Sequence, residues 1–225
     1  MKMLVKILPK YMWIPILFAI LWNWLAYQGT RYITTPLYHY NLTNDVDNQI
    51  PVIPAAMIIY WGCYLFWVIN YIIGCRQEED IAFRFISAEF LAKLGCMIIY
   101  IAFPTTNVRP DIDGNGFFED MMRQLYSVDA ADNLFPSIHC LMSWMGFIAV
   151  RKNPNVKGWY KVVSLVIAIL VFISTLTTKQ HVLVDIAGGV ILAEGSYYLT
   201  KKTGFVVVYK RFMKKVGGVF KLDTA

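Results

Sequence analysis

The sequence predicts an all-α protein, a polytopic membrane helical bundle of about six transmembrane helices in one domain over residues 1–225. Three observations predict it. Of the 225 residues, 57% are hydrophobic and only 16% are charged, a balance typical of a chain whose solvent is lipid. The apolar residues gather in stretches close to the length of about 20 residues that one crossing needs. No internal repeat or low-complexity tract divides the chain.

Six apolar stretches are predicted to cross the membrane. They are Tyr11–Gln28, Val52–Gly74, Phe85–Phe103, Phe135–Val150, Val162–Thr177 and His181–Thr200. In lipid, a crossing segment must satisfy its backbone amides internally, which favours helices. The first stretch follows Lys2, Lys6 and Lys10 as a signal peptide would, but it lacks a small-x-small cleavage site. We therefore expect an uncleaved first helix.

The basic residues outside these stretches indicate an orientation. Sixteen of them belong to the chain ends and to the connections on one side, whereas Arg31, Arg109, Arg123 and Lys179 fall on the other. Lys and Arg are retained on the cytoplasmic side, so both termini are expected there, with residues 201–225 as a basic cytoplasmic tail. Because the basic residues flank apolar spans, the formal charge of +6 does not indicate a nucleic-acid partner.

The opposite side carries the loops 29–51 and 104–134. A connection of roughly thirty residues is long unless it is functional or disordered. Aromatic and apolar residues between Phe117 and Tyr126 predict a short interfacial helix, so we interpret 104–134 as an ordered extracytoplasmic lid loop. Its stretch from Asp111 to Gly116 resembles the opening of a calcium loop, but Met122 stands where the bidentate Glu belongs, which favours solvated acids instead.

Three polar groups are predicted to meet on that outer side. They are Asn107–Pro110, Pro136–His139 and Ser174–Asp185. His181 and Asp185 are four residues apart, so on a helix they share one face and the carboxylate can accept the imidazole Nδ1 proton. A carboxylate inside a span needs such a partner.

These groups favour a phosphate-binding pocket. Pro136 is predicted as the first residue of a helix, which places Ser137 and nearby amides at an anion-binding N-terminus. Arg109 and Lys179 can add fixed positive charge, the first through a two-pronged contact and the second as a point charge.

The three groups resemble the motifs of the type 2 phosphatidic acid phosphatase superfamily, commonly K-x6-R-P, P-S-G-H and S-R-x5-H-x3-D. The resemblance covers about residues 93–189. Here the second motif has Ile138 in place of Gly, the third has Thr175 in place of Arg, and the first keeps only Arg109 and Pro110. The form Ser174-Thr-x3-Lys179-x-His181 is similar to the branch with inositol phosphorylceramide synthases and many bacterial relatives, in which Lys replaces the missing Arg.

The resemblance implies a membrane-integral phosphatase that hydrolyses a lipid phosphate or diphosphate without a metal or cofactor. In this scheme His181 attacks phosphorus to form a phosphohistidine, Asp185 holds His181, and His139 protonates the leaving oxygen. The implied phosphate-binding residues are Arg109, Lys179, Ser137 and Ser174. The implied location is the plasma membrane of a bacterium, with the active site on the extracytoplasmic side.

Alternatives remain open at this point. A phosphotransferase that passes the phospho-group to an alcohol such as inositol would share the chemistry up to phosphohistidine. A family member without catalysis would only bind lipid. A transporter would use Glu89, Lys93, Asp185 and Glu194 as a polar path, although the i, i+4 spacing of Glu89 and Lys93 also predicts a buried ion pair. The four cysteines indicate neither a disulfide nor zinc, and His39 is interpreted as a loop residue.

Overall fold

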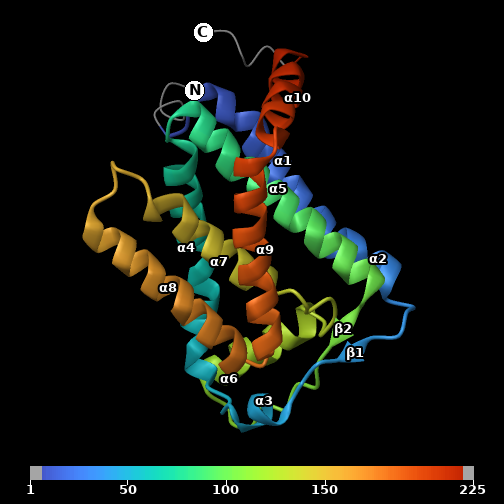
Figure 1. The fold of residues 1–225 in the computed structure, drawn as a ribbon. Coiled ribbons are helices and arrows are strands. Elements are labelled where there is room, and N and C mark those ends of the chain that lie inside the picture. Colours follow the sequence, from blue (N-terminus) through green and yellow to red (C-terminus); the bar gives the residue numbers. More distant parts are fainter. Residues whose placement is uncertain (1–6, 220–225) are drawn as a thin grey trace.

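The computed structural model describes residues 7–219, which form a helical bundle with one very short pair of strands (Figure 1). The bundle helices are α1 (Trp13–Trp24), α4 (Met57–Cys75), α5 (Glu79–Ala102), α7 (Ile138–Arg151), α8 (Gly158–Thr177), α9 (Leu183–Lys202) and α10 (Phe205–Val219). The connections contain α2 (Thr30–Thr34), α3 (Asp45–Gln49) and α6 (Phe117–Val128), and the parallel strands β1 (Tyr40–Asn41) and β2 (Thr105–Thr106). The predicted all-α class is confirmed.

Three helical segments within residues 7–219 are long and apolar enough to cross a membrane. They are Pro54–Cys75, Glu79–Ala102 and Gly158–Thr177, and the shorter Ile138–Arg151 is also apolar. At 1.5 Å per residue, the 14 residues of α7 extend about 21 Å, less than the ~30 Å hydrocarbon core. The chain thus has the helices of a membrane protein, and the count of six crossings stays a prediction.

Two predicted helix starts are wrong. The fourth span does not begin at Pro136, because Ser137 is the N-cap of α7 and its hydroxyl accepts a hydrogen bond from the Cys140 amide at 3.2 Å. The sixth does not begin at His181, because α9 starts at Leu183. The first helical run is also longer than predicted, since a π-helical turn (Leu25–Gly29) joins α1 directly to α2.

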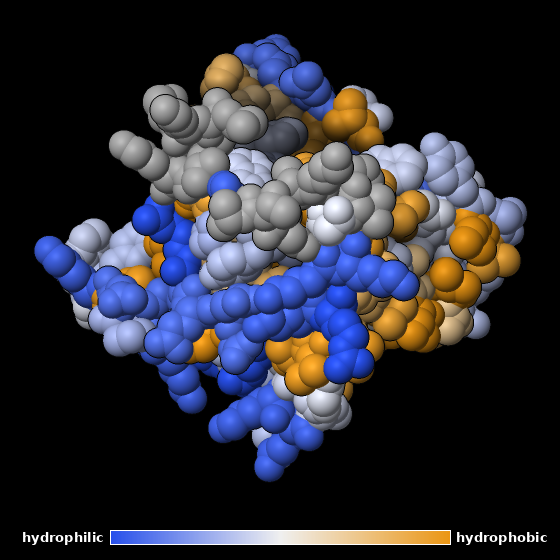
Figure 2. All heavy atoms as spheres, turned by 90° about the horizontal axis from the view of Figure 1, so that it is seen from above, coloured by the Kyte–Doolittle hydropathy of each residue, from blue (hydrophilic) through white to orange (hydrophobic). Residues whose placement is uncertain are grey.

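The two ends of the bundle differ in character. The start of α1 and the helix α10 lie at one end, whereas α3, α6 and the strands lie at the other (Figure 1). Seen from the α10 end, hydrophilic side chains gather across the molecule and apolar ones lie at its flank (Figure 2). The predicted basic tail is helical as far as Val219; Lys2, Lys6 and Lys221 of the orientation argument lie outside the described residues.

The interior of the bundle contains a buried ion pair within α5. α7 packs against α4, α8 and α9, and α5 packs against α9. Within α5, the Lys93 ammonium contacts the Glu89 carboxylate, and both side chains are 1% exposed. The predicted buried ion pair is confirmed. The two opposite charges are paired within one helix, which offsets part of the cost of burying them.

The lid loop contains the predicted short helix, α6. Its residues Met122 and Leu125 are buried against Met57 and Tyr60, so the helix is anchored to the start of α4. The Arg123 guanidinium in α6 donates to two carbonyls of the preceding turn, those of Ile112 at 2.8 Å and Gly114 at 2.9 Å. This turn is therefore organised around an arginine side chain.

The helices α7 and α9 approach each other closely at two glycines. A Cβ atom on Gly189 would lie 2.6 Å from the Ser137 carbonyl oxygen and 3.0 Å from the Leu141 amide nitrogen. A Cβ atom on Gly188 would lie 2.6 Å from the Phe135 ring. The two backbones can thus approach only because these positions lack side chains.

We predict that Gly189→Ala destabilises the protein and that Gly195→Ala does not. In a helix interior, alanine is favoured over glycine by roughly 0.5–1 kcal/mol. Nothing lies within 4 Å of a Cβ atom on Gly195, so that variant should gain this amount. At Gly189 the added methyl group meets backbone atoms, which outweighs the gain. Thermal unfolding in detergent of both variants checks the prediction, and equal stabilisation of the two would contradict it.

Candidate functional site

His181 lies in the turn between α8 and α9, residues 178–182, which we call the histidine turn. Its Nδ1 atom lies 3.2 Å from Oδ2 of Asp185, so the predicted contact is confirmed. The geometry differs from the prediction, because His181 precedes α9 and Asp185 occupies the first turn of that helix. The same Oδ2 atom accepts the Val182 amide at 3.0 Å. One carboxylate therefore caps the helix and orients the imidazole.

The histidine turn is held by backbone contacts from α8. The Thr175 carbonyl accepts the amides of Gln180 at 2.9 Å and His181 at 3.1 Å. Asn107 Nδ2 donates to the Lys179 carbonyl at 3.0 Å. Thr175 stands where the related motif has Arg, and here it supports the turn through its main chain.

His139 lies in the first turn of α7 and faces the same space as His181. The two ring centroids are 5.9 Å apart. On its other side, His139 stacks on Tyr60 with centroids 4.8 Å apart and lies 5.5 Å from the Trp67 ring. Its Nε2 atom is buried and has no hydrogen-bond partner among the described residues. An aromatic wall thus holds the ring while this nitrogen stays available.

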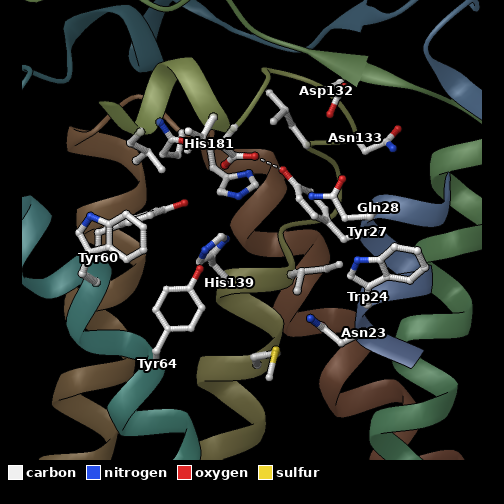
Figure 3. A pocket seen from close by; sticks show the side chains of 18 of the residues that line it. Asn23, Trp24, Tyr27, Gln28, Tyr60, Tyr64, Asp132, Asn133, His139 and His181 are labelled. Atoms are coloured by element: carbon white, nitrogen blue, oxygen red, sulfur yellow. Dashed lines mark hydrogen bonds between the residues drawn. The ribbon is translucent and has the colours of Figure 1, made fainter. Parts of the chain in front are cut away.

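Both histidines line one cavity of about 460 Å³, into which their rings point (Figure 3). Side chains of the first helix and α4 form its two walls, and the lid loop contributes Asp129, Asp132 and Asn133. His181 also borders a second cavity beside residues 43–52, on the loop side of the histidine turn. The nucleophile candidate is 8% exposed, so access to it is through these cavities.

Arg109 lines the main cavity, as expected of a phosphate ligand. Its guanidinium donates to the Asp129 carbonyl and, at 2.8 Å, to Oε1 of Gln180. It also lies 4.9 Å from the ring centroid of Tyr126. Burial raises the pKa of Tyr126 to about 12, and its hydroxyl donates to the Thr178 carbonyl. Arg109 therefore ties the lid loop to the histidine turn.

The other three predicted phosphate ligands are differently placed. Ser137 is fully buried and its hydroxyl caps α7. The Ser174 hydroxyl donates to the Val171 carbonyl at 2.7 Å inside α8. Lys179 borders the second cavity, where its ammonium donates to the carbonyls of Asp47 at 2.9 Å and Ile50 at 2.6 Å. In this structure none of the three side chains lines the main cavity.

Asp47 is a supporting residue that sequence reasoning missed. It is 4% exposed, and its Oδ1 atom accepts the Leu183 amide at the start of α9 at 2.8 Å. Its Oδ2 atom accepts the Asn44 amide at 3.0 Å. The loop 29–51 thus reaches across to hold the helix that carries Asp185. Only the Asn44-x-x-Asp47 capping pattern marked this segment as ordered.

The lid loop is held to the first helix by contacts that were also missed. Tyr27 donates to the Asp129 carboxylate, and Arg31 Nε lies 3.0 Å from Asp132 Oδ2. Burial raises the pKa of Asp132, an effect that the Arg31 charge opposes. Asn133 hydrogen-bonds to Thr30, again between the lid and the first helical run. These pairs are about a hundred residues apart in sequence, and no local pattern marks them.

We predict that Lys179→Met lowers stability and changes substrate affinity little. The variant leaves the carbonyls of Asp47 and Ile50 without their donor, which costs roughly 1–3 kcal/mol when such groups are buried. Thermal unfolding and the KM for a phosphate substrate check this, with the exposed Lys157→Met as the control. A tenfold higher KM with unchanged stability would instead place the ammonium on the substrate.

Comparison with known proteins agrees with these features. A family model described as the PAP2 superfamily matches residues 39–199, which include every site residue named above except Tyr27, Thr30 and Arg31. No curated protein and no solved structure matches the chain. The matched region covers well over half of the 225 residues. The chain therefore belongs to the PAP2 superfamily, the type 2 phosphatidic acid phosphatases.

Proposed function

We propose that this membrane protein hydrolyses a lipid phosphate or diphosphate through a phosphohistidine on His181. Family membership supports a phosphatase or phosphotransferase in general. The observation that carries the finer proposal is the pair of histidines facing one cavity, with the Nδ1 atom of one held by a carboxylate. This arrangement leaves Nε2 of His181 as the nucleophilic atom.

The first step forms a bond between His181 Nε2 and phosphorus while the bond from phosphorus to the lipid oxygen breaks. The electron pair of that bond stays with the lipid oxygen, which takes a proton from His139. The Asp185 carboxylate stabilises the positive charge that develops on the His181 ring. Such general acid help is worth about 10²–10⁴-fold in rate.

The second step reverses these roles. A water molecule attacks phosphorus, neutral His139 takes its proton, and the bond between phosphorus and His181 Nε2 breaks to release phosphate. Among the described residues, Arg109 is the only arginine or lysine that lines the main cavity, and it would stabilise the phosphoryl oxygens after exchanging its contact with Gln180 for the substrate. No step requires a metal.

The walls of the cavity support a lipid substrate. They are built from two apolar helices and are rich in aromatic side chains. Apolar and aromatic walls favour the binding of a hydrocarbon chain, which a soluble phosphate ester lacks. We propose the extracytoplasmic side for the site, because α10, in the described part of the basic tail, lies at the opposite end of the bundle (Figure 1).

Transfer to an alcohol is the second candidate. The rim of the cavity carries the hydrogen-bonding side chains of Gln28, Asp129 and Asn133, which could bind the hydroxyl groups of an acceptor such as inositol. The acceptor would attack in place of water, so the first step is unchanged. Formation of a new phosphoester in the presence of inositol would identify this activity.

We predict that phosphate release survives EDTA and falls by at least about 10³-fold in His181→Ala. The assay uses purified protein with a panel of phosphatidic acid, phosphatidylglycerol phosphate and polyprenyl diphosphate. His39→Ala is the matched control, since this third histidine lies in the outer loop and outside the cavity. Loss of activity in EDTA, or its persistence in His181→Ala, would overturn the proposed mechanism.

A further inference from the structure

The first helix forms one wall of the cavity. This helix lies outside the matched family region, which begins at residue 39. The lining residues of this helix are Ile20, Asn23, Trp24, Tyr27 and Gln28. Their spacing of three and four residues places all of them on one helix face. The segment therefore presents a continuous stripe to the substrate.

The facing wall belongs to α4. Its lining residues are Tyr60, Trp61, Tyr64 and Trp67. Trp24 on one wall is 51% exposed, and Trp61 and Tyr64 on the other are 43% and 45% exposed. Because these residues both line the cavity and reach the outside of an apolar bundle, the cavity continues to the lipid-facing surface. A hydrocarbon chain can lie between α1 and α4 while its phosphate meets His181.

Asn23 is the polar exception in the deeper part of this stripe. Its side chain points into the cavity (Figure 3), between Ile20 and Trp24 in the lining. Its amide nitrogen, the donor end of the side chain, faces the cavity (Figure 3), whereas its amide oxygen is buried without a hydrogen-bond partner in the part of the chain that the structure describes. An N–H donor that faces apolar surroundings without an acceptor is costly. In a membrane helix, such a group is expected to serve a ligand.

The position of Asn23 indicates which part of a lipid it meets. Tyr27 contacts Asp129 at the polar rim, and Asn23 lies one helical turn away, about 6 Å further toward the α10 end of the bundle. A lipid with its phosphate at His181 would place the atoms a few bonds from phosphorus at this level. In diacylglycerol and ceramide lipids those atoms include an ester or amide carbonyl, whereas a polyprenyl diphosphate carries only hydrocarbon there.

We infer that the first helix selects the lipid and that the Asn23 amide donates a hydrogen bond to a carbonyl in the linkage between phosphate and hydrocarbon. The inference rests on the proposed function and narrows its substrate class to lipids with an ester or amide linkage. Asn23 has no part in the chemical steps. Its effect is on the binding of one group of the substrate and should vanish for lipids that lack that group.

The test compares Asn23→Leu with wild type on three substrates: a diacyl phosphatidic acid, its dialkyl ether analogue and farnesyl diphosphate. Loss of one hydrogen bond should lower kcat/KM for the diacyl lipid about three- to tenfold and leave the other two unchanged. Leu21→Ala, on the lipid-facing side of the same helix at 53% exposure, is the matched control and should change none of them. Equal thermal unfolding midpoints show that both variants are folded.

Two results would overturn the inference: an equal loss on all three substrates, or no loss on the diacyl lipid. If the wild type releases phosphate from none of them, the proposed function fails separately. Equilibrium binding of the diacyl and dialkyl lipids then decides the inference. A diacyl preference in wild type that Asn23→Leu removes would support it, and equal binding of the two lipids by wild type would contradict it.

Discussion

The contact of α7 with α9 at Gly188 and Gly189 is the constraint on which the rest of the site depends. Without side chains at these positions, the Ser137 amide reaches the Asp185 carbonyl at 3.0 Å and joins the first turns of the two helices. His139 lies two residues after Ser137, and His181 is bonded to the Asp185 side chain. The separation of the two histidines is therefore set by this backbone contact together with the hydrogen bond between His181 and Asp185.

Hydrogen bonds from the outer loops also support the site. Asp47 holds the start of α9, Asn107 holds the histidine turn, and Thr105 accepts the amides of Leu134 and Phe135 just before α7. Each contact joins a loop to a segment that carries His139, His181 or Asp185. The lid loop is thus part of the support of the site, which explains why so long a connection is ordered.

Local patterns in the sequence predicted what depends on neighbouring residues. The helices, the short lid helix, the ion pair of Glu89 and Lys93 and the contact of His181 with Asp185 all follow from spacings of up to about one helical turn. The starts of α7 and α9 were misjudged because a proline and a histidine were counted as helical, whereas the caps lie one residue after each of them.

Long-range contacts could not be predicted in this way. Lys179 has the charge that a phosphate ligand needs, yet its ammonium donates hydrogen bonds to two carbonyls more than a hundred residues away in sequence. The place of Asn23 in the cavity wall, and the tie of Tyr27 to Asp129, likewise exist only after the first helix has packed beside the lid. Such contacts depend on tertiary packing, which a single sequence does not display.

In the proposed mechanism, His181 is the nucleophile and His139 is the acid for the leaving group and the base for the water. Rapid quenching of His139→Ala with an aryl phosphate tests it most directly, because an aryl leaving group departs without an acid while the second step still lacks its base. Phosphate should then accumulate on the peptide that contains His181, as located by mass spectrometry. A phosphorylated residue elsewhere, or turnover with no phosphoenzyme at any time, would contradict it.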